Sequence, residues 1–172
     1  MKYNKTQRIL LLFHLFYYCQ EVSIPEIIDY FSLEDISVSL KTFSRDILLL
    51  KNAGLVQVKY SKKDKAYIPL EVEKRFVPLD GKYLTPNLPD NKSQRLYMEK
   101  IIRLCTLMTD MIMYEVENPI DWYRKRYPKL SDRTRQRDFK QLREIGYKVS
   151  YAPADEEGPG LYCYEYPHGA FY

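Results

Sequence analysis

Side chains that bind polyanions are concentrated in one part of this 172-residue chain. Residues 122–148 contain 10 Lys and Arg against 3 Asp and Glu, whereas the whole chain has a net charge of only +4. Arginine and lysine bind phosphate oxygens, and arginine and glutamine also hydrogen-bond the edges of bases. A basic cluster of this size on a small domain is typical of a protein that binds a polyanion. The alternative interpretation is a charged helix face that is simply hydrated.

The same types of side chain recur 92 positions apart. Residues 39–55 align with residues 131–147 without a gap, and 6 of the 17 positions are identical. The identical pairs are Ser39 and Ser131, Thr42 and Thr134, Arg45 and Arg137, Asp46 and Asp138, Leu50 and Leu142, and Gly54 and Gly146. Upstream, three apolar residues within 9–15 match three within 101–107 at the same offset. An internal repeat of this kind predicts two similar modules rather than one larger domain.

Each module is predicted to begin with two helices. Apolar residues recur at three and four positions over about 5–20 and about 93–115, which is the spacing of an amphipathic helix. A shorter second helix follows in each module and is opened by Pro25 or by Pro119. Proline is favoured there because the first turn of a helix does not need its amide.

The repeated segment itself predicts a third helix followed by a hairpin. Ser39 and Ser131 suit the N-cap, because a serine hydroxyl accepts a hydrogen bond from a free amide of the first turn. Gly54 and Gly146 suit the position after the last turn, because glycine adopts a left-handed backbone without strain. The strands of the two hairpins are expected at about 55–60 and 66–70, and at about 147–152 and 161–166.

Helix, helix, turn, helix and hairpin is the order of elements in a winged helix-turn-helix domain. The predicted fold class is therefore mostly α with small β-hairpin wings (α+β), arranged as tandem winged helix-turn-helix domains. The first domain is expected at 1–70, and the second, with an acidic wing and an aromatic C-terminal strand, at 93–172. Residues 71–92 contain three prolines and lack helical periodicity, so an extended linker is predicted there.

The pattern of the third helix resembles a known family. Ser-x-x-Thr-x-x-Arg-Asp, with Leu four and Gly eight residues after the Asp, is similar to the DeoR-type winged helix family and to the N-terminal domain of WYL-domain transcriptional regulators. The resemblance covers about residues 5–70 and, more weakly, about 96–166, where Arg135 stands at a position that the family fills with an apolar residue. It implies sequence-specific binding of duplex DNA, with the third helix in the major groove and the wing against the backbone.

The residues expected to contact DNA lie on the outer face of each third helix and on the first wing. The recognition helices are expected at about 39–53 and about 131–145. The predicted DNA-binding residues of the first module are Ser39, Lys41, Thr42, Ser44, Arg45, Lys62 and Lys63. Those of the second module are Ser131, Arg133, Thr134, Gln136, Arg137 and Lys140. Acidic Asp46 and Asp138 are unsuited to phosphate, and each is expected to form a structural ion pair that orients a neighbouring arginine.

Other function classes have little support in the sequence. Neither His14 nor His168 has a cysteine or carboxylate nearby at metal-ligand spacing, and no glycine-rich phosphate loop or nucleophile elbow occurs. We therefore expect no catalytic activity, no metal site and no cofactor. The three cysteines are widely separated, which favours reduced thiols, and no apolar run reaches the roughly 20 residues of a membrane span. A cytoplasmic protein that does not bind membranes is predicted.

The sequence thus predicts a transcriptional regulator that binds double-stranded DNA. Either both modules read bases, so that one chain imitates a dimer, or one reads them and the other provides dimerisation. Formation of a homodimer is left open. Two alternatives stay open. One is a winged-helix adaptor that binds proteins through the acidic tail and its aromatic strand. The other is a DNA-binding protein of plasmid maintenance or replication.

Overall fold

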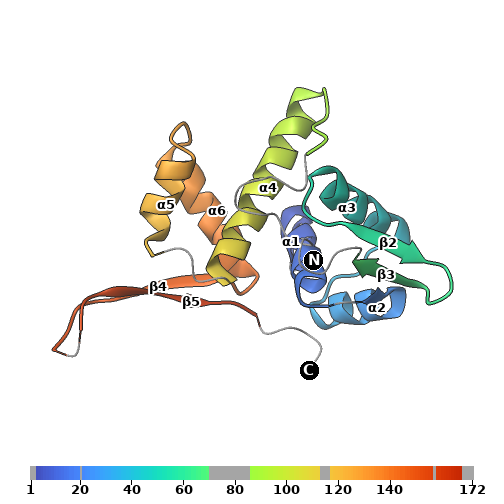
Figure 1. Cartoon of the computed structure of the whole chain (residues 1–172), viewed down its shortest axis with the longest axis horizontal. Helices are drawn as coiled ribbons and strands as arrows, with labels where there is room; N and C mark the ends of the chain where they lie inside the picture. Colours follow the sequence, from blue (N-terminus) through green and yellow to red (C-terminus); the bar gives the residue numbers. More distant parts are fainter. Residues whose placement is uncertain (1–2, 20, 70–85, 113–116, 157, 168–172) are drawn as a thin grey trace. The chain divides into compact units, whose positions relative to one another are not determined.

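The computed structural model has a mixed α+β fold. It describes residues 3–19, 21–69, 86–112, 117–156 and 158–167. The helices are α1 (Lys5–Tyr18), α2 (Ile24–Leu33), α3 (Leu40–Asn52), α4 (Lys92–Ile112), α5 (Pro119–Arg126) and α6 (Asp132–Glu144). The strands are β1 (Val22–Ser23), β2 (Val58–Ser61), β3 (Ala66–Pro69), β4 (Lys148–Ala152) and β5 (Leu161–Glu165) (Figure 1). The predicted α+β class with small antiparallel sheets is confirmed.

The described residues form two compact units. The N-terminal unit ends at Thr106 and the C-terminal unit begins at Leu107, so the division falls within α4. The sequence instead predicts that the second domain begins at residue 93. Most of the predicted linker, residues 71–92, lies outside the described residues, which resume at residue 86.

The first turns of α4 belong to the N-terminal unit because they contact α1. The hydroxyls of Thr6 and Tyr97 lie 3.5 Å apart, and Lys5 Nζ lies 4.7 Å from the centre of the Tyr97 ring. Just before α4, the amide of Asn87 donates a 2.7 Å hydrogen bond to the carbonyl of Asn52 at the end of α3. Residues 86–106 therefore belong to the N-terminal unit. The sequence analysis instead assigns them to the linker and to the second module.

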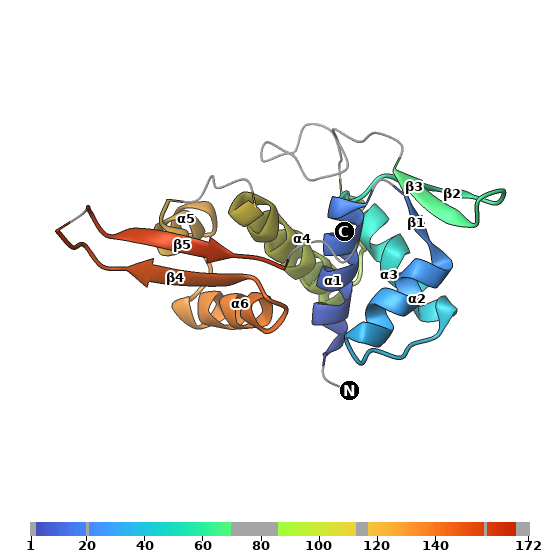
Figure 2. The same cartoon turned by 90° about the horizontal axis from the view of Figure 1, so that it is seen from below.

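Helix α1 is buried along most of its length. All 11 residues from Thr6 to Phe16 are buried. A helix that is apolar on nearly every side has to be covered on nearly every side. The core of the unit also includes Phe31 of α2 and Leu50 of α3, both fully buried. Within this unit, Figures 1 and 2 show α1 beside α2 and α3, with the small sheet at one side of these helices.

A three-stranded antiparallel sheet completes the N-terminal unit. Its strand order is β1-β3-β2, with Val22 opposite Tyr67 and Lys59 opposite Ile68. Strand β1 is an addition to the sequence prediction, which has no strand before the second helix. It is only two residues long, and its Ser23 is also the N-cap of α2, so no alternating pattern marks it as a strand.

The C-terminal unit has the same order of helices and a smaller sheet. After the second half of α4 come α5, α6 and the β4–β5 hairpin, in which Lys148 lies opposite Glu165 and Tyr151 opposite Tyr162. Among the described residues, β5 pairs only with β4. Figure 2 shows the hairpin alongside α5 and α6, with its turn projecting beyond them.

The third helices of the two units are built alike. Ser39 and Ser131 both have an extended backbone, and each hydroxyl accepts a hydrogen bond from the amide three residues later, at 3.3 Å. At the other end, Gly54 and Gly146 have φ values of 71° and 96°. Both helices end in a Schellman motif, in which the amides of the glycine and of the next residue bond back to the last turn. The predicted caps are confirmed at both ends.

The described helices, cysteines and potential metal-ligating side chains bear on the predictions about membranes, thiols and metals. None of the described helices has both the length and the apolar character that a membrane crossing requires. Cys19, Cys105 and Cys163 form no disulfide bond with a described residue. Within the part of the chain that the structure describes, no three His, Cys, Asp or Glu side chains are grouped so that they would hold a metal ion.

His14 is buried within α1 and makes the stability of the protein depend on pH. Burial lowers the pKa of this imidazole from 6.5 to about 4, because the charged form would lose its hydration. The unfolded chain therefore binds a proton below pH 6.5 that the folded chain does not bind until about pH 4. The contribution to stability is complete above pH 6.5, and about 3 kcal/mol of it is lost as the pH falls to about 4.

Urea unfolding of the wild type and of His14→Leu, each measured above pH 6.5 and near pH 4, tests this assignment. The substitution should remove most of the pH dependence that His14 causes. Carboxylates contribute equally to the pH dependence of the free energy of unfolding in both proteins, so the difference between the two proteins isolates the contribution of His14. The same loss of stability in both proteins at low pH would contradict it.

Candidate nucleic-acid interface

Helix α3 is anchored to α1 by a buried ion pair. Arg8 Nε donates to Asp46 Oδ2 at 2.7 Å, and Arg8 Nη2 donates to Asp46 Oδ1 at 3.2 Å. Only 10% of the Arg8 side chain and 4% of the Asp46 side chain is exposed. Two parallel hydrogen bonds constrain both the position of α3 along α1 and its rotation. The ion pair expected for Asp46 is confirmed, and its partner comes from another helix rather than from α3 itself.

Asp138 anchors α6 from the equivalent position of the repeat. It is buried and accepts a 2.7 Å hydrogen bond from the Tyr123 hydroxyl of α5. Tyr123 lies 92 positions after Phe31, which is likewise buried in the second helix of its unit. The Tyr123 ring also lies 6.2 Å from the Phe139 ring of α6, centre to centre. These contacts determine which face of α6 is left exposed.

The outward face of α3 is mostly polar. Lys41, Ser44 and Arg45 are exposed, together with Leu48. The Ser44 hydroxyl donates to the carbonyl of Leu40 at 3.0 Å, so part of its hydrogen-bonding capacity is used within the helix. Lys41 and Arg45 form no ion pair with any described residue. Two cations of this face are therefore available to a partner.

The outward face of α6 carries more positive charge. Arg133, Gln136, Arg137 and Lys140 are all exposed and follow the spacing of one helix face, as predicted. Lys140 Nζ lies 3.8 Å from Glu144 Oε1. Arg133 and Arg137 form no ion pair with a residue that the structure describes. The structure thus brings together two free guanidinium groups and an amide, which are the groups that form bidentate hydrogen bonds with guanine and adenine.

The hydroxyl residues at the starts of these two helices are already engaged in capping. The hydroxyls of Ser39 and Thr42 lie 3.2 Å apart, and those of Ser131 and Thr134 lie 3.1 Å apart. Both serines are exposed and both threonines are half-buried. A phosphate oxygen can therefore reach the serines more readily than the threonines.

The loops of the two hairpins have opposite charge. Lys62 and Lys63 are exposed where β2 turns into β3. The loop between β4 and β5 instead exposes Asp155 and Glu156. Because like charges repel, only the first loop is suited to a phosphate backbone.

A groove beside α3 is not predicted by the sequence. It has a volume of about 650 Å³ and is lined by Arg45 and Leu48 of α3 and by residues that include Asn87 and Tyr97. The C-terminal part of the outward face of α3 therefore borders a groove rather than open solvent. No local pattern reveals this groove, because it forms only when the segment from 86 to 98 packs on the first unit.

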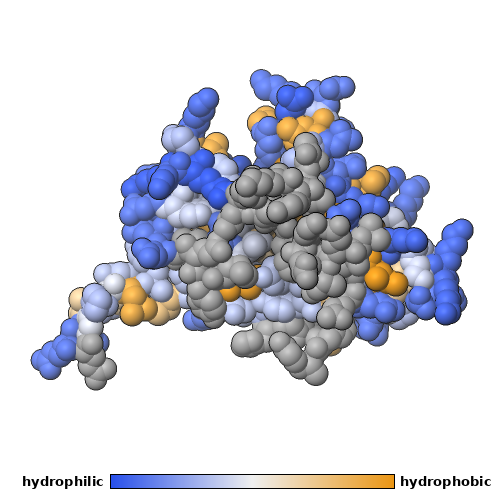
Figure 3. Space-filling view, in the orientation of Figure 1, coloured by the Kyte–Doolittle hydropathy of each residue, from blue (hydrophilic) through white to orange (hydrophobic). Residues whose placement is uncertain are grey.

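Helix α5 adds cations that the sequence prediction does not assign to DNA. Arg124, Lys125 and Arg126 are exposed in its last turn. Arg124 Nη2 lies 3.0 Å from Asp132 Oδ2 at the start of α6, and hydrogen bonds from Arg124 and Arg135 lower the pKa of that carboxyl. Figure 3 shows hydrophilic side chains gathered over α5 and α6. The run of three basic residues in the sequence is the signal that identifies this extension of the basic surface.

Comparison with known proteins assigns no family to this chain. No protein-family model, no curated protein and no solved structure matches it. The features that bear on function are therefore those of the chain itself. They are two anchored helices with outward polar faces, of which α6 is the more basic.

The Arg8–Asp46 ion pair should dominate the placement of α3. Asp46→Ala leaves the Arg8 guanidinium buried without that carboxylate, so the free energy of unfolding should fall by about 3–5 kcal/mol. Urea unfolding followed by circular dichroism measures the change. The matched control is Arg124→Ala, which removes one partner of an exposed ion pair and should leave stability nearly unchanged. Equal effects of the two substitutions would rule out a dominant role for the buried pair.

Proposed function

We propose that the protein is a cytoplasmic transcriptional regulator that binds duplex DNA in a sequence-specific manner. One observation carries the proposal. Helix α6 exposes Arg133, Gln136 and Arg137 on one face, while Asp138 and Leu142 are buried on the other. A helix with its side chains is about 10–12 Å wide, and the major groove of B-DNA is about 12 Å wide. Arg and Gln side chains on such a helix reach the base edges that distinguish one sequence from another.

The order of elements supports tandem winged helix-turn-helix domains. In each unit a helix is followed by a short helix, by a capped third helix and by a hairpin. In the N-terminal unit, β1 pairs with β3 and gives the hairpin a third strand. In this proposal α3 and α6 are the recognition helices, and the β2–β3 hairpin is a wing.

The N-terminal unit is proposed to contribute mainly phosphate contacts. Its outward face of α3 carries Lys41 and Arg45, and its hairpin loop carries Lys62 and Lys63. Side chains of this kind fix the position of a protein on the duplex and carry little sequence information. The more strongly charged α6, with its glutamine, is better suited to direct reading of bases.

A second candidate function, that of a protein-binding adaptor, is favoured by the β4–β5 hairpin. Tyr151 is 56% exposed and Leu161 is 54% exposed, and the adjoining loop exposes Asp155 and Glu156. Exposed apolar residues beside acidic ones are typical of protein-interaction surfaces rather than of DNA-binding ones.

Selection of binding sites from a random duplex library with the purified chain separates the two functions. Fluorescence anisotropy of the selected site should then show a strong dependence on salt. If about 6–10 phosphates are contacted, the affinity should fall roughly 10³–10⁵-fold between about 50 and 200 mM salt. No binding of any duplex at the lower salt concentration would exclude the proposed function and favour the adaptor.

The substitution Arg137→Gln tests whether α6 reads bases. The affinity for the selected site should fall by roughly 10-fold to 100-fold, since a bidentate arginine contact contributes about 1–3 kcal/mol of discrimination. The affinity for an unrelated duplex should change much less. Lys148→Gln is the control, because it removes one exposed positive charge of the same unit, from the hairpin rather than from α6. An equal loss on both duplexes would mean that Arg137 contacts phosphate only.

A further inference from the structure

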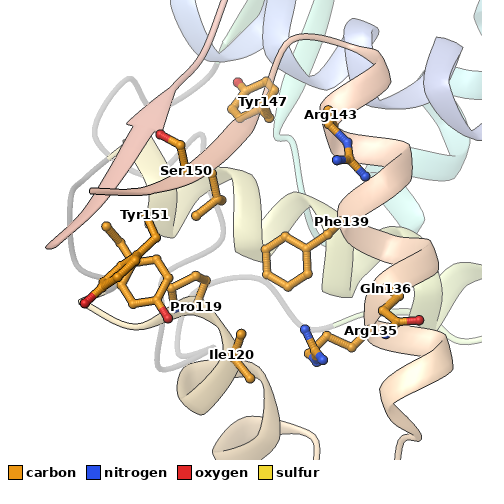
Figure 4. A pocket seen from close by; sticks show the side chains of 11 residues that line it. Pro119, Ile120, Arg135, Gln136, Phe139, Arg143, Tyr147, Ser150 and Tyr151 are labelled. Atoms are coloured by element: carbon orange, nitrogen blue, oxygen red, sulfur yellow. The ribbon is translucent and has the colours of Figure 1, made fainter. Parts of the chain in front are cut away.

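The C-terminal unit contains a pocket between α6 and one face of the β4–β5 hairpin. Its volume is about 290 Å³. Tyr151 and Tyr162 are cross-strand partners on the hairpin, with ring centres 5.0 Å apart, and both line the pocket. In Figure 4, Arg135 and Phe139 point from α6 toward the space between that helix and the hairpin. All the residues that line the pocket belong to this one unit.

In the N-terminal unit, side chains nearly fill the space that corresponds to this pocket. Only about 20 Å³ is left there, between α2, α3 and β3. The two linings share three positions of the 92-residue repeat: Ile27 and Pro119, Phe43 and Arg135, and Ser44 and Gln136. Phe43 is buried, and its ring centre lies 4.9 Å from that of Phe31. The pocket of the C-terminal unit therefore opens where an arginine replaces a core phenylalanine.

The walls of the pocket combine aromatic rings with two guanidinium groups. The Arg135 side chain is 13% exposed, and its Nε lies 3.3 Å from Asp132 Oδ1. Asp132 also pairs with Arg124, so one carboxylate serves two cations. Arg143, two turns further along α6, forms no ion pair with a residue in the described part of the chain. The pocket therefore has an excess of positive charge beside apolar and aromatic walls.

We propose that this pocket binds a small aromatic carboxylate. A carboxylate matches a guanidinium in shape and accepts two parallel hydrogen bonds from it. The ring would pack against Phe139 and Tyr151, since aromatic rings attract one another in offset and edge-on contacts. An apolar cavity of about 150 Å³ holds benzene. A pocket of about 290 Å³ therefore has room for an aromatic ring together with its carboxylate and further substituents.

The ligand is also expected to weaken DNA binding, and this part of the inference rests on the proposed function. Gln136 lines the pocket and is also exposed on the outward face of α6. A carboxylate in the pocket would occupy Gln136 and neutralise part of the positive charge that Arg143 adds to this helix. Fewer uncompensated cations near the phosphates reduce the affinity for DNA.

Titration of the ¹⁵N-labelled full chain with benzoate, followed by amide chemical shifts, tests the pocket without DNA. Benzoate should produce saturable shifts in α6 and in the first residues of β4. Benzamide has the same ring and a neutral group of similar shape, so it should bind at least tenfold more weakly. Absence of saturable shifts up to the solubility limit of benzoate, or equal binding of benzamide, would overturn the proposal.

Substitutions locate the site. Arg143→Gln should weaken benzoate binding at least tenfold. Arg135→Phe introduces the residue that nearly fills the equivalent cavity of the N-terminal unit. It should abolish benzoate binding while the spectrum remains that of a folded protein. Lys148→Gln removes an exposed charge outside the pocket and should leave benzoate binding unchanged. Unchanged binding by a folded Arg135→Phe protein, or an equal loss in Lys148→Gln, would place the ligand elsewhere and overturn the assignment.

A DNA measurement separates the two proposals from each other. At a saturating benzoate concentration, the wild type should lose at least fivefold in affinity for its selected duplex, and Arg135→Phe should show no response to benzoate. Saturable binding of benzoate by a chain that binds no DNA would leave the pocket standing and remove the proposed function. Binding of benzoate with unchanged DNA affinity would overturn the regulatory part alone.

Discussion

In each third helix an exposed arginine is followed directly by a buried aspartate, and this constraint determines what the helix can present. Successive residues of an α-helix point about 100° apart. Holding Asp46 against Arg8 therefore turns Arg45 toward solvent. In the second unit the hydrogen bond from Tyr123 to Asp138 has the same effect on the residue that precedes it. Rotation of the helix about its axis would separate the buried carboxylate from its hydrogen-bond partner. The carboxylate would then be buried without a partner, which is costly. The outward basic face is thus a consequence of the buried contact.

The two units share the order of their helices and the anchoring of the third helix, but their surfaces differ. The turn between β2 and β3 exposes three lysines and one aspartate, whereas the loop between β4 and β5 exposes acidic residues. On the outward face, exposed Leu48 has exposed Lys140 as its counterpart 92 positions later. Buried Phe43 has Arg135 as its counterpart. The cavity beside Phe43 in the N-terminal unit is nearly filled, whereas the pocket beside Arg135 in the C-terminal unit is open. Within the repeat, the caps, the buried aspartate and the exposed arginine before it are identical, whereas the positions of Phe43 and Leu48 differ between the two units.

The elements that sequence reasoning predicts correctly are those with local signals. Serine caps and glycine ends define α3 and α6 to within about one residue, because each signal acts on the backbone next to it. Features that depend on distant residues are not predicted. Arg8, the partner of Asp46, lies 38 positions away, and no spacing rule identifies it. Strand β1 exists only because β3 lies beside it, and the groove at α3 exists only because the start of α4 packs on the first unit.

The pocket and the basic face of the C-terminal unit depend on the same tyrosine. The Tyr123 hydroxyl holds Asp138, and the Tyr123 ring contacts the Phe139 ring, which lines the pocket. Closely packed side chains do not deform continuously, so a ring that moves to admit a ligand displaces the ring beside it. Displacement of Tyr123 changes the hydrogen bond that sets the rotation of α6. The arginines of the outward face are carried on that same rigid helix, so under the proposed function a small movement at Phe139 would reorient them relative to the DNA. In the N-terminal unit Phe43 nearly fills the equivalent space, which leaves only about 20 Å³, so a ligand has no comparable site beside α3.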